Sequence, residues 1–293
     1  MAWRLLRLEP ASLQEELPSS PEPEGFHPLE APWEAKRGGG ASWPEPLYFV
    51  DGRERAEALV AQGPRLALLG CVAAGAVVLK GGRTGFLDLR VRRVGVGLEG
   101  ALWAGELVYE PVPSLGEGLE GLWAGLRAAR EALEKEVAEG LEGGLLVVDG
   151  PVRLLREGPL LGYIKTHWAH YLPKEQEALL EALAPGERTP AFRVRRKGLE
   201  LASWYLRLPL PPEGVRPPLA GLLRVETPLH GPFLELADLS LGLFPALASH
   251  PVKDPRAPQN LLPVGGLERE LGRRMGRLEV VGRMLARHLG GGR

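Results

Sequence analysis

Apolar and polar positions recur along the chain with two different periods, which predicts an α/β protein. Short runs that are wholly apolar, or that alternate apolar with polar residues, are typical of β-strands when glycine and proline bound them. Such runs occupy residues 47–50, 65–82, 86–97, 101–112, 145–148, 192–198, 203–210 and 221–229. The run at 145–148 is apolar throughout, as expected of a strand buried on both faces of a mixed sheet.

Apolar residues three and four positions apart predict the helices. The clearest helix covers residues 117–139, where Leu119, Leu122 and Leu126 begin one apolar face and Gly140 follows the last turn. We also expect helices at residues 1–17, 53–62, 173–184 and about 266–289, the last of them rich in arginine.

The chain divides near residue 46. Residues 18–46 are rich in proline, glycine and tryptophan and predict an extended connection. We therefore expect residues 1–46 to form an N-terminal helix and extended arm, and residues 47–293 to form a single domain that ends in a helix.

Two aspartates follow apolar strand candidates in the same way. The chain has only five aspartates, and two of them occur as Asp51-Gly52 and Asp149-Gly150. Neighbouring strands lie about 4.8 Å apart, so acids at the ends of adjacent strands can share a cation. Oxygen ligands suit Mg²⁺ and Mn²⁺, and two such ions can hydrolyse a phosphodiester. Asp-Gly is also a common turn pair, and spacing alone leaves both interpretations open.

The helix between these strands offers a third acid. It carries Glu131 and Glu134, and a helical wheel places Glu134 closer to the apolar face. Periodicity therefore slightly favours Glu134 as the acid that faces the sheet.

Residues 192–208 interleave cations with aromatic rings, a pattern typical of surfaces that bind single-stranded nucleic acid. The candidate DNA-binding residues are Arg193, Arg195, Arg196, Lys197, Trp204 and Tyr205. The alternative is a solvated strand face whose aromatic residues belong to the core.

Composition indicates the class of protein and its cellular compartment. The net charge of −1 and an apolar content of 44% are ordinary for a soluble globular protein. A single cysteine, Cys71, excludes an intramolecular disulfide and fits a reducing cytoplasm; it lies in an apolar run, which predicts a buried thiol. The longest apolar run, 66–79, is shorter than a membrane-spanning helix. No phosphate-binding G-x-x-x-x-G-K-[ST] motif is present, which argues against a motor protein.

The order of these elements resembles the ribonuclease H-like fold and, more narrowly, the NurA family of DNA-end-processing nucleases, which work with the HerA hexameric translocase. The matching segments are YFVDGR (48–53), LRAAREALE (126–134), LLVVDGPV (145–152), GYIKTH (162–167) and LLRVETP (222–228).

The resemblance implies a site and a function. Asp51, Glu131 and Asp149 would hold Mn²⁺ or Mg²⁺, with Glu131 preferred over Glu134, and Lys165 would assist at the phosphate. The implied activity is that of a 5′–3′ exonuclease and single-strand endonuclease in the resection of DNA double-strand breaks. A homodimer and a HerA-like ATPase partner are implied as well.

One departure from the family pattern concerns the end of the chain. The family carries a late His or Asp in a segment like YP-x-x-L-x-x-A-H, where this chain has APQNLLPVGGLE (257–268), with Gly265-Gly266 at that pair. His250, Asp254 and Asn260 are candidates to replace the missing ligand, and none is in the expected frame. The alternative function is therefore a catalytically weakened, DNA-binding or regulatory subunit of the translocase complex.

Overall fold

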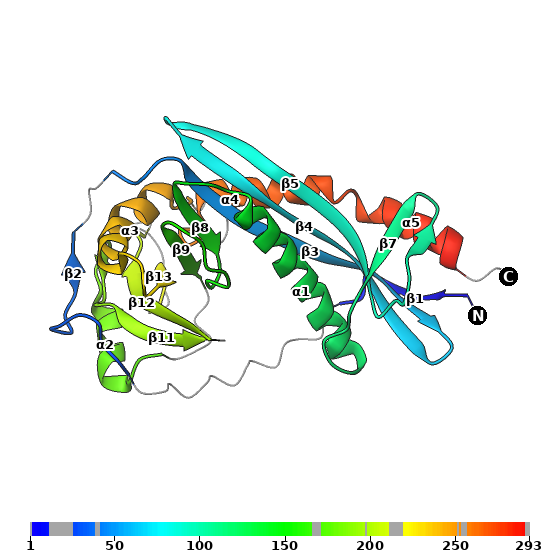
Figure 1. Ribbon diagram of the computed structural model, residues 1–293, viewed down its shortest axis with the longest axis horizontal. Coiled ribbons are helices and arrows are strands. Elements are labelled where there is room, and N and C mark those ends of the chain that lie inside the picture. The colour runs from blue at the N-terminus through cyan, green and yellow to red at the C-terminus, as the bar shows by residue number, and fades with distance from the viewer. Residues whose placement is uncertain are drawn as a thin grey trace.

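Figure 1 shows the computed structural model, an elongated α/β arrangement in which long strands run beside a long helix. The structure describes residues 2–11, 26–38, 42–165, 171–196, 198–210, 219–250, 252 and 257–290.

One mixed sheet organises the molecule. Its strands are β1 (Arg4–Leu8), β2 (Lys36–Arg37), β3 (Leu47–Gln62), β4 (Arg65–Lys80), β5 (Arg83–Val96), β6 (Leu102–Ala104), β7 (Leu107–Val112), β8 (Leu145–Asp149), β9 (Leu160–Ile164), β10 (Glu187–Arg188), β11 (Phe192–Arg196), β12 (Leu199–Arg207) and β13 (Leu222–Pro228). Their order in the sheet is β2-β10-β12-β13-β9-β8-β3-β4-β5-β7-β6, with β1 paired to β3 and β11 to β12. The β3–β8, β8–β9 and β5–β7 pairs are parallel. The predicted α/β class with a mixed sheet is confirmed.

Helices cover both faces of this sheet. In the described part of the chain they are α1 (Gly118–Glu139), α2 (Lys174–Ala182), α3 (Phe233–Leu247), α4 (Leu262–Arg274) and α5 (Leu278–Leu289). Helix α1 packs on one face, where Leu126 and Leu133 join a core with side chains of β3, β4 and β8. Helices α3 and α4 pack on the other face, where Leu243 and Leu267 join Phe49 and further residues.

Strand β3 differs most from the sequence prediction. We expected a helix at residues 53–62, but these residues continue β3, which pairs with β4 from Leu47↔Leu79 to Gln62↔Arg65. The segment contains good helix formers, and long-range pairing with β4 overrides that local preference. The predicted helix at 1–17 is also wrong where it is described, because Arg4–Leu8 pair with β3; residues 12–17 lie outside the described residues.

Three further elements differ in detail. Residues 101–112 form the hairpin β6–β7 rather than one strand, because the chain reverses at Gly105 with φ of 65°. The arginine-rich segment forms two helices, α4 and α5, with Gly276 (φ 80°) between them. Helix α3 was not predicted, since its sequence is apolar on most sides and contains Pro245.

Cys71 lies fully buried in β4, as predicted, and burial raises the pKa of its thiol to about 11. None of the described helices is long and apolar enough to cross a membrane.

A buried ion-pair network stabilises the β12–β13 side of the sheet. Glu226 is fully buried, pairs with Arg196, lies 2.7 Å from Arg224 and accepts a 2.7 Å hydrogen bond from the Val152 backbone N–H. Burial acts to raise the pKa of Glu226, but Arg224 and Arg196 outweigh burial and hold the pKa below its ordinary value. The network therefore contributes stability only while Glu226 is ionised.

We expect Glu226→Gln to lower the free energy of unfolding at pH 7 by about 3–5 kcal/mol, because it leaves the buried Arg224 and the partly buried Arg196 without their carboxylate. Since the folded pKa is lowered, this contribution is present above pH ~4.3 and is lost as pH falls through the folded pKa. Denaturant titrations from pH 7 to pH 3 should show the two proteins converging in acid. Glu200→Gln, at an exposed ion pair with Arg195, should cost at most about 1 kcal/mol. Equal losses for the two variants would contradict this account.

Candidate metal centre

The pairing of β3 with β8 brings Asp51 and Asp149 together. The two strands are parallel, and their last paired residues are Val50 and Val148. Side chains alternate along a strand, so both aspartates, one position further, point to the face on which Phe49 is buried. The sequence prediction that these two acids lie on adjacent strands is confirmed.

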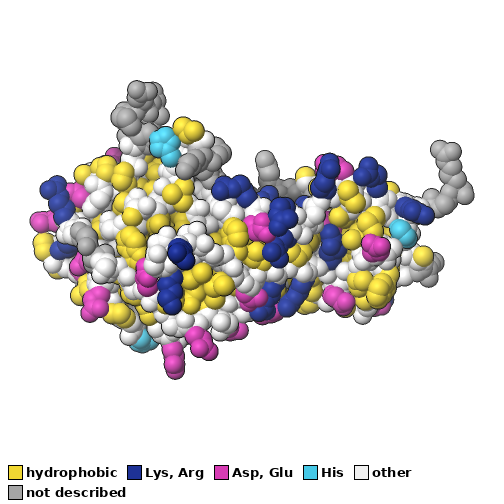
Figure 2. All heavy atoms as spheres, turned by 90° about the horizontal axis from the view of Figure 1, so that it is seen from above, with side chains coloured by type: hydrophobic (Ala, Val, Ile, Leu, Met, Phe, Trp, Pro, Cys, Tyr) yellow, Lys and Arg dark blue, Asp and Glu magenta, His cyan; other side chains and the backbone are white. Residues whose placement is uncertain are grey.

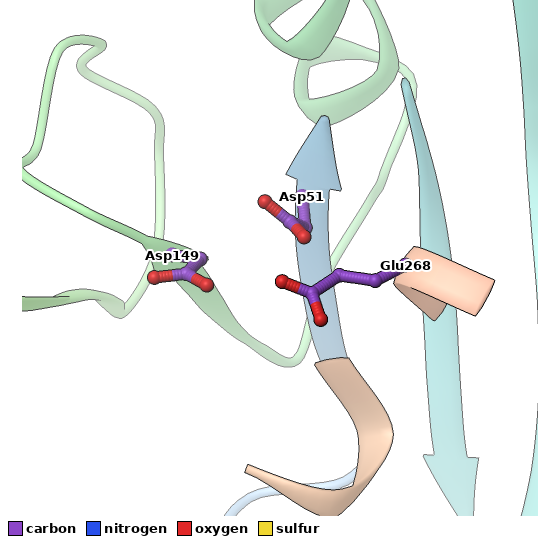
Figure 3. A group of neighbouring side chains, drawn as sticks. All are labelled: Asp51, Asp149 and Glu268. Carbon is purple, nitrogen blue, oxygen red and sulfur yellow. The ribbon is translucent and has the colours of Figure 1, made fainter. Parts of the chain in front are cut away.

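Helix α4 supplies a third acid, Glu268. Carboxylate oxygens of Asp51, Asp149 and Glu268 all lie within 4.8 Å of one another. Figure 3 shows the three side chains converging from β3, from the end of β8 and from the helix. Asp51 is 9% exposed, and the other two are partly buried. These three residues are called the carboxylate cluster below.

The carboxylate cluster concentrates negative charge where water is scarce. Burial raises the pKa of Asp51 well above its ordinary range, and the nearby Asp149 carboxylate raises it further. Glu134 and Glu268 act in the same direction, and Lys165 opposes them. The pKa of Asp149 is also raised by burial, although Lys165 offsets part of that effect.

Lys165 is the cation of the centre. It follows β9, and its Nζ donates to Asp149 Oδ2 at 2.5 Å and to Asn260 Oδ1 at 3.2 Å. Asn260 is fully buried, and its Nδ2 lies 3.5 Å from Glu268 Oε2. Gln259 Nε2 donates to the Lys165 carbonyl at 3.3 Å. The segment before α4 therefore fixes both Lys165 and the third acid.

Tyr163 forms the apolar side of the centre. It is fully buried on β9 beside Asp149, and its ring packs 5.7 Å from that of Phe244. The Lys165 Nζ lies 5.5 Å from the ring centroid, within the range of a cation–π contact. Burial, and then the charges of Asp149 and Asp51, raise the pKa of the Tyr163 hydroxyl, so this residue adds no charge of its own.

The two glutamates of α1 lie on the other face of the sheet. Glu131 pairs with Arg153 at 3.1 Å and lies 3.6 Å from Arg130. Glu134 pairs with Arg130, and burial raises the pKa of its carboxyl group although Arg130 opposes this. Both glutamates line a cavity of about 210 Å³ that Asp149 also reaches. Neither belongs to the carboxylate cluster.

The candidate DNA-binding residues are largely engaged within the fold. Trp204 is fully buried with its Nε1 on Ser240, and Tyr205 is 3% exposed and stacks on Phe192. Their rings are closed to a nucleic-acid base, so the interpretation of these two as stacking residues is corrected: they belong to the core.

The cations of this segment differ among themselves. Arg196 belongs to the Glu226 network, Arg195 pairs with Glu200 at 2.8 Å, and Arg193 is partly buried. Lys197 lies outside the described residues.

Sequence reasoning missed Glu268. It lies three residues beyond Gly265, within one helical turn of the place where the family's late ligand is expected. A search for an acid one turn along the same helix would have found it. Asn260, which we considered as a replacement ligand, contacts Lys165 and Glu268 instead.

The donor set fits a hard divalent cation. Three carboxylates facing one lysine leave excess negative charge, and Mg²⁺ and Mn²⁺ prefer oxygen ligands of this kind. A bound cation would offset the repulsion that raises the pKa of Asp51.

The fold and the centre thus define an α/β protein with a carboxylate site suited to a divalent metal. Residues 47–264 match the model of the NurA domain, so the chain belongs to the NurA family. Among solved structures, the crystal structure of the NurA nuclease from Sulfolobus solfataricus shares the fold, with a TM-score of 0.55 and 10% sequence identity over 87% of this chain and 88% of that chain. No curated protein matches the chain.

We expect Asp51→Asn to raise the free energy of unfolding in EDTA by roughly 1 kcal/mol, because it removes repulsion between carboxylates inside the cluster. A divalent cation should make the wild type the more stable of the two proteins. At a cation concentration of a hundred times the Kd, binding stabilises the wild type by about 2.7 kcal/mol and the variant far less. Thermal scans in EDTA and in Mn²⁺ measure both effects. Asp88→Asn, at a surface ion pair with Arg90, is the matched control and should show neither. An Asp51→Asn variant stabilised by Mn²⁺ as strongly as the wild type would rule out this cation site.

Proposed function

We propose that this protein is a divalent-metal-dependent deoxyribonuclease that acts in the resection of DNA double-strand breaks, as a 5′–3′ exonuclease and single-strand endonuclease. The observation that carries the proposal is the carboxylate cluster, formed by Asp51 within β3, Asp149 at the end of the parallel strand β8 and Glu268 of α4, with Lys165 beside it. Membership of the NurA family, and a fold shared with a NurA nuclease, support it.

Asp51, Asp149 and Glu268 would hold Mn²⁺ or Mg²⁺. Bound there, such ions supply an activated water and neutralise charge on the leaving oxygen of a phosphodiester. Lys165 offers ammonium protons to a phosphate oxygen, and its hydrogen bond to Asn260 aims the ammonium group. Tyr163 and the surrounding core restrict water on one side of the centre, which strengthens these interactions.

The family resemblance predicts Glu131 as the metal ligand on helix α1, and this stays a prediction. Its carboxylate is paired with Arg153 on the α1 side of the sheet, whereas Glu268 lies with the two aspartates. The geometry therefore favours Glu268 as the third ligand, and variants of both residues separate the two assignments.

In Mn²⁺, wild-type protein is expected to degrade single-stranded DNA, and Asp51→Ala to do so at least about 100-fold more slowly. A metal centre supplies several kcal/mol of transition-state stabilisation, and each 1.36 kcal/mol is tenfold in rate. Glu268→Gln should show a comparable loss and Glu131→Gln a smaller one. Glu139→Gln, at the exposed end of α1, is the matched control.

Gel assays of initial rates, with EDTA as the blank, decide the outcome. Cleavage by Asp51→Ala at the parental rate would refute the site. If the wild type neither cleaves nor takes up Mn²⁺ in a calorimetric titration, the protein is instead a DNA-binding or regulatory subunit, as the departure at Gly265-Gly266 suggests.

We further propose that the protein works in the cytoplasm as a homodimer bound to a HerA-like hexameric ATPase. The family resemblance motivates this proposal, and the sequence contains no G-x-x-x-x-G-K-[ST] motif, which argues for a separate motor. Light scattering after gel filtration should give twice the 31.8 kDa chain mass, and mixing with the HerA-like ATPase should give one larger species. A monomer that elutes apart from the ATPase would contradict both expectations.

A further inference from the structure

Arg53 lies beside the carboxylate cluster and has no assigned role. It is two residues beyond Asp51 on β3, so both side chains project from the same face of the strand, about 6.6 Å apart at the backbone. Its side chain is exposed, whereas Asp51 is buried. Arg53 is therefore a surface cation at the rim of the centre.

Helix α4 holds the Arg53 guanidinium. Its Nη1 donates to the carbonyl oxygen of Glu268 at 3.5 Å, the residue that supplies the third acid. A Cβ atom at Gly272 would lie 3.2 Å from the same Nη1. Gly272, one turn beyond Glu268, thus leaves space for the guanidinium. The hydrogen bond to Glu268 fixes the guanidinium relative to the carboxylate cluster.

Other arginines near the centre have carboxylate partners. Arg55 and Arg93 pair with the buried Glu57 at 2.7 and 3.3 Å. Arg130 pairs with Glu54 and Glu134, and Arg153 with Glu131. Within the described ranges, Arg53 has no ion pair. Its charge is available to an anion from solution.

Within the described residues, the edge of β3 next to Arg53 is open in the sense that no strand pairs with it. Strand β8 pairs only with residues 47–50 of β3, and β1 only with residues 58–61. Between them, residues 51–56 have no partner strand on that side in the described part of the chain. An extended polymer can therefore approach the centre along this edge. Figure 2 shows Lys and Arg side chains, with Asp and Glu among them, over the middle of the molecule.

We propose that Arg53 binds the phosphate next to the one held at the carboxylate cluster and so sets the path of a single DNA strand across the open edge of β3. A guanidinium matches a phosphate in charge and in its paired donor geometry. This inference rests on the proposed nuclease function and adds a substrate-positioning residue to it.

The test measures DNA binding without metal. Anisotropy of a fluorescent single-stranded oligonucleotide, titrated with the protein in EDTA at several KCl concentrations, gives the slope of log K against log salt. Arg53→Ala should weaken binding at low salt for every oligonucleotide sequence and reduce the slope by about 0.7, the value for one phosphate contact. Arg83→Ala, an exposed arginine at the far end of the β4–β5 hairpin, should leave the slope unchanged.

A second variant guards against a general loss of structure. Gly272→Glu places a carboxylate beside the Arg53 guanidinium and should lower the slope as Arg53→Ala does, with no further loss when the two are combined. Thermal scans confirm that each variant is folded.

The slopes decide the inference independently of cleavage. Equal slopes for wild type and Arg53→Ala overturn the role of Arg53, as does a wild type without salt-dependent binding, even where Asp51→Ala abolishes cleavage and the nuclease proposal stands. Conversely, a wild type that cleaves no DNA in Mn²⁺ removes the nuclease proposal, and the binding slopes still report whether Arg53 contacts a phosphate.

Discussion

The parallel register between β3 and β8 is the constraint on which the rest of the centre depends. Four residue pairs, from Leu47↔Leu145 to Val50↔Val148, fix it. Their side chains alternate between two cores, with Phe49 and Val147 in one and Val50 and Leu146 in the other. A slip of one residue would move each side chain to the wrong face. Hydrophobic burial on both faces therefore holds two carboxylates together that would repel each other if the strands were free to shift.

Other buried acids in the described part of the fold are neutralised, and the carboxylate cluster differs from them in this respect. Glu226 faces two arginines and a backbone N–H, and Glu57 faces Arg55, Arg93 and the Tyr109 hydroxyl at 2.6 Å. At the carboxylate cluster the balance is reversed, because Lys165 is the cation that opposes three acids. A fold that neutralises Glu57 and Glu226 in this way, and does not do so at the carboxylate cluster, retains an electrostatic cost there that a bound cation can relieve.

The local sequence pattern predicts part of this centre, namely the two aspartates. Apolar runs before Asp51 and Asp149 place both at buried strands. That the two side chains share a face follows from the parallel register of β3 and β8, which the sequence does not give. The local pattern does not rank Glu268 with the two aspartates, because its approach depends on how α4 crosses β3, which is a tertiary contact; its place one helical turn from the expected late ligand is the signal that the sequence offers. For the same reason a helical wheel ranks Glu131 and Glu134 but cannot tell which face of the sheet α1 covers. The prediction for Trp204 and Tyr205 is wrong because these neighbours point to opposite faces of β12 and each joins a different core, whereas the sequence does not show that both faces are covered.

The two Asp-Gly pairs have different physical origins despite their common sequence. Gly150 adopts φ of 100° and turns the chain after β8, as a turn pair should. Gly52 lies inside β3, where a Cβ atom would lie 2.3 Å from Glu134 Oε1. A side chain at this position would compete with the Glu134 carboxylate for space. Through this gap Glu134 comes close enough to raise the pKa of Asp51 from the opposite face of the sheet. Helix α1 therefore acts on the centre electrostatically through the sheet, while α4 contributes a side chain directly.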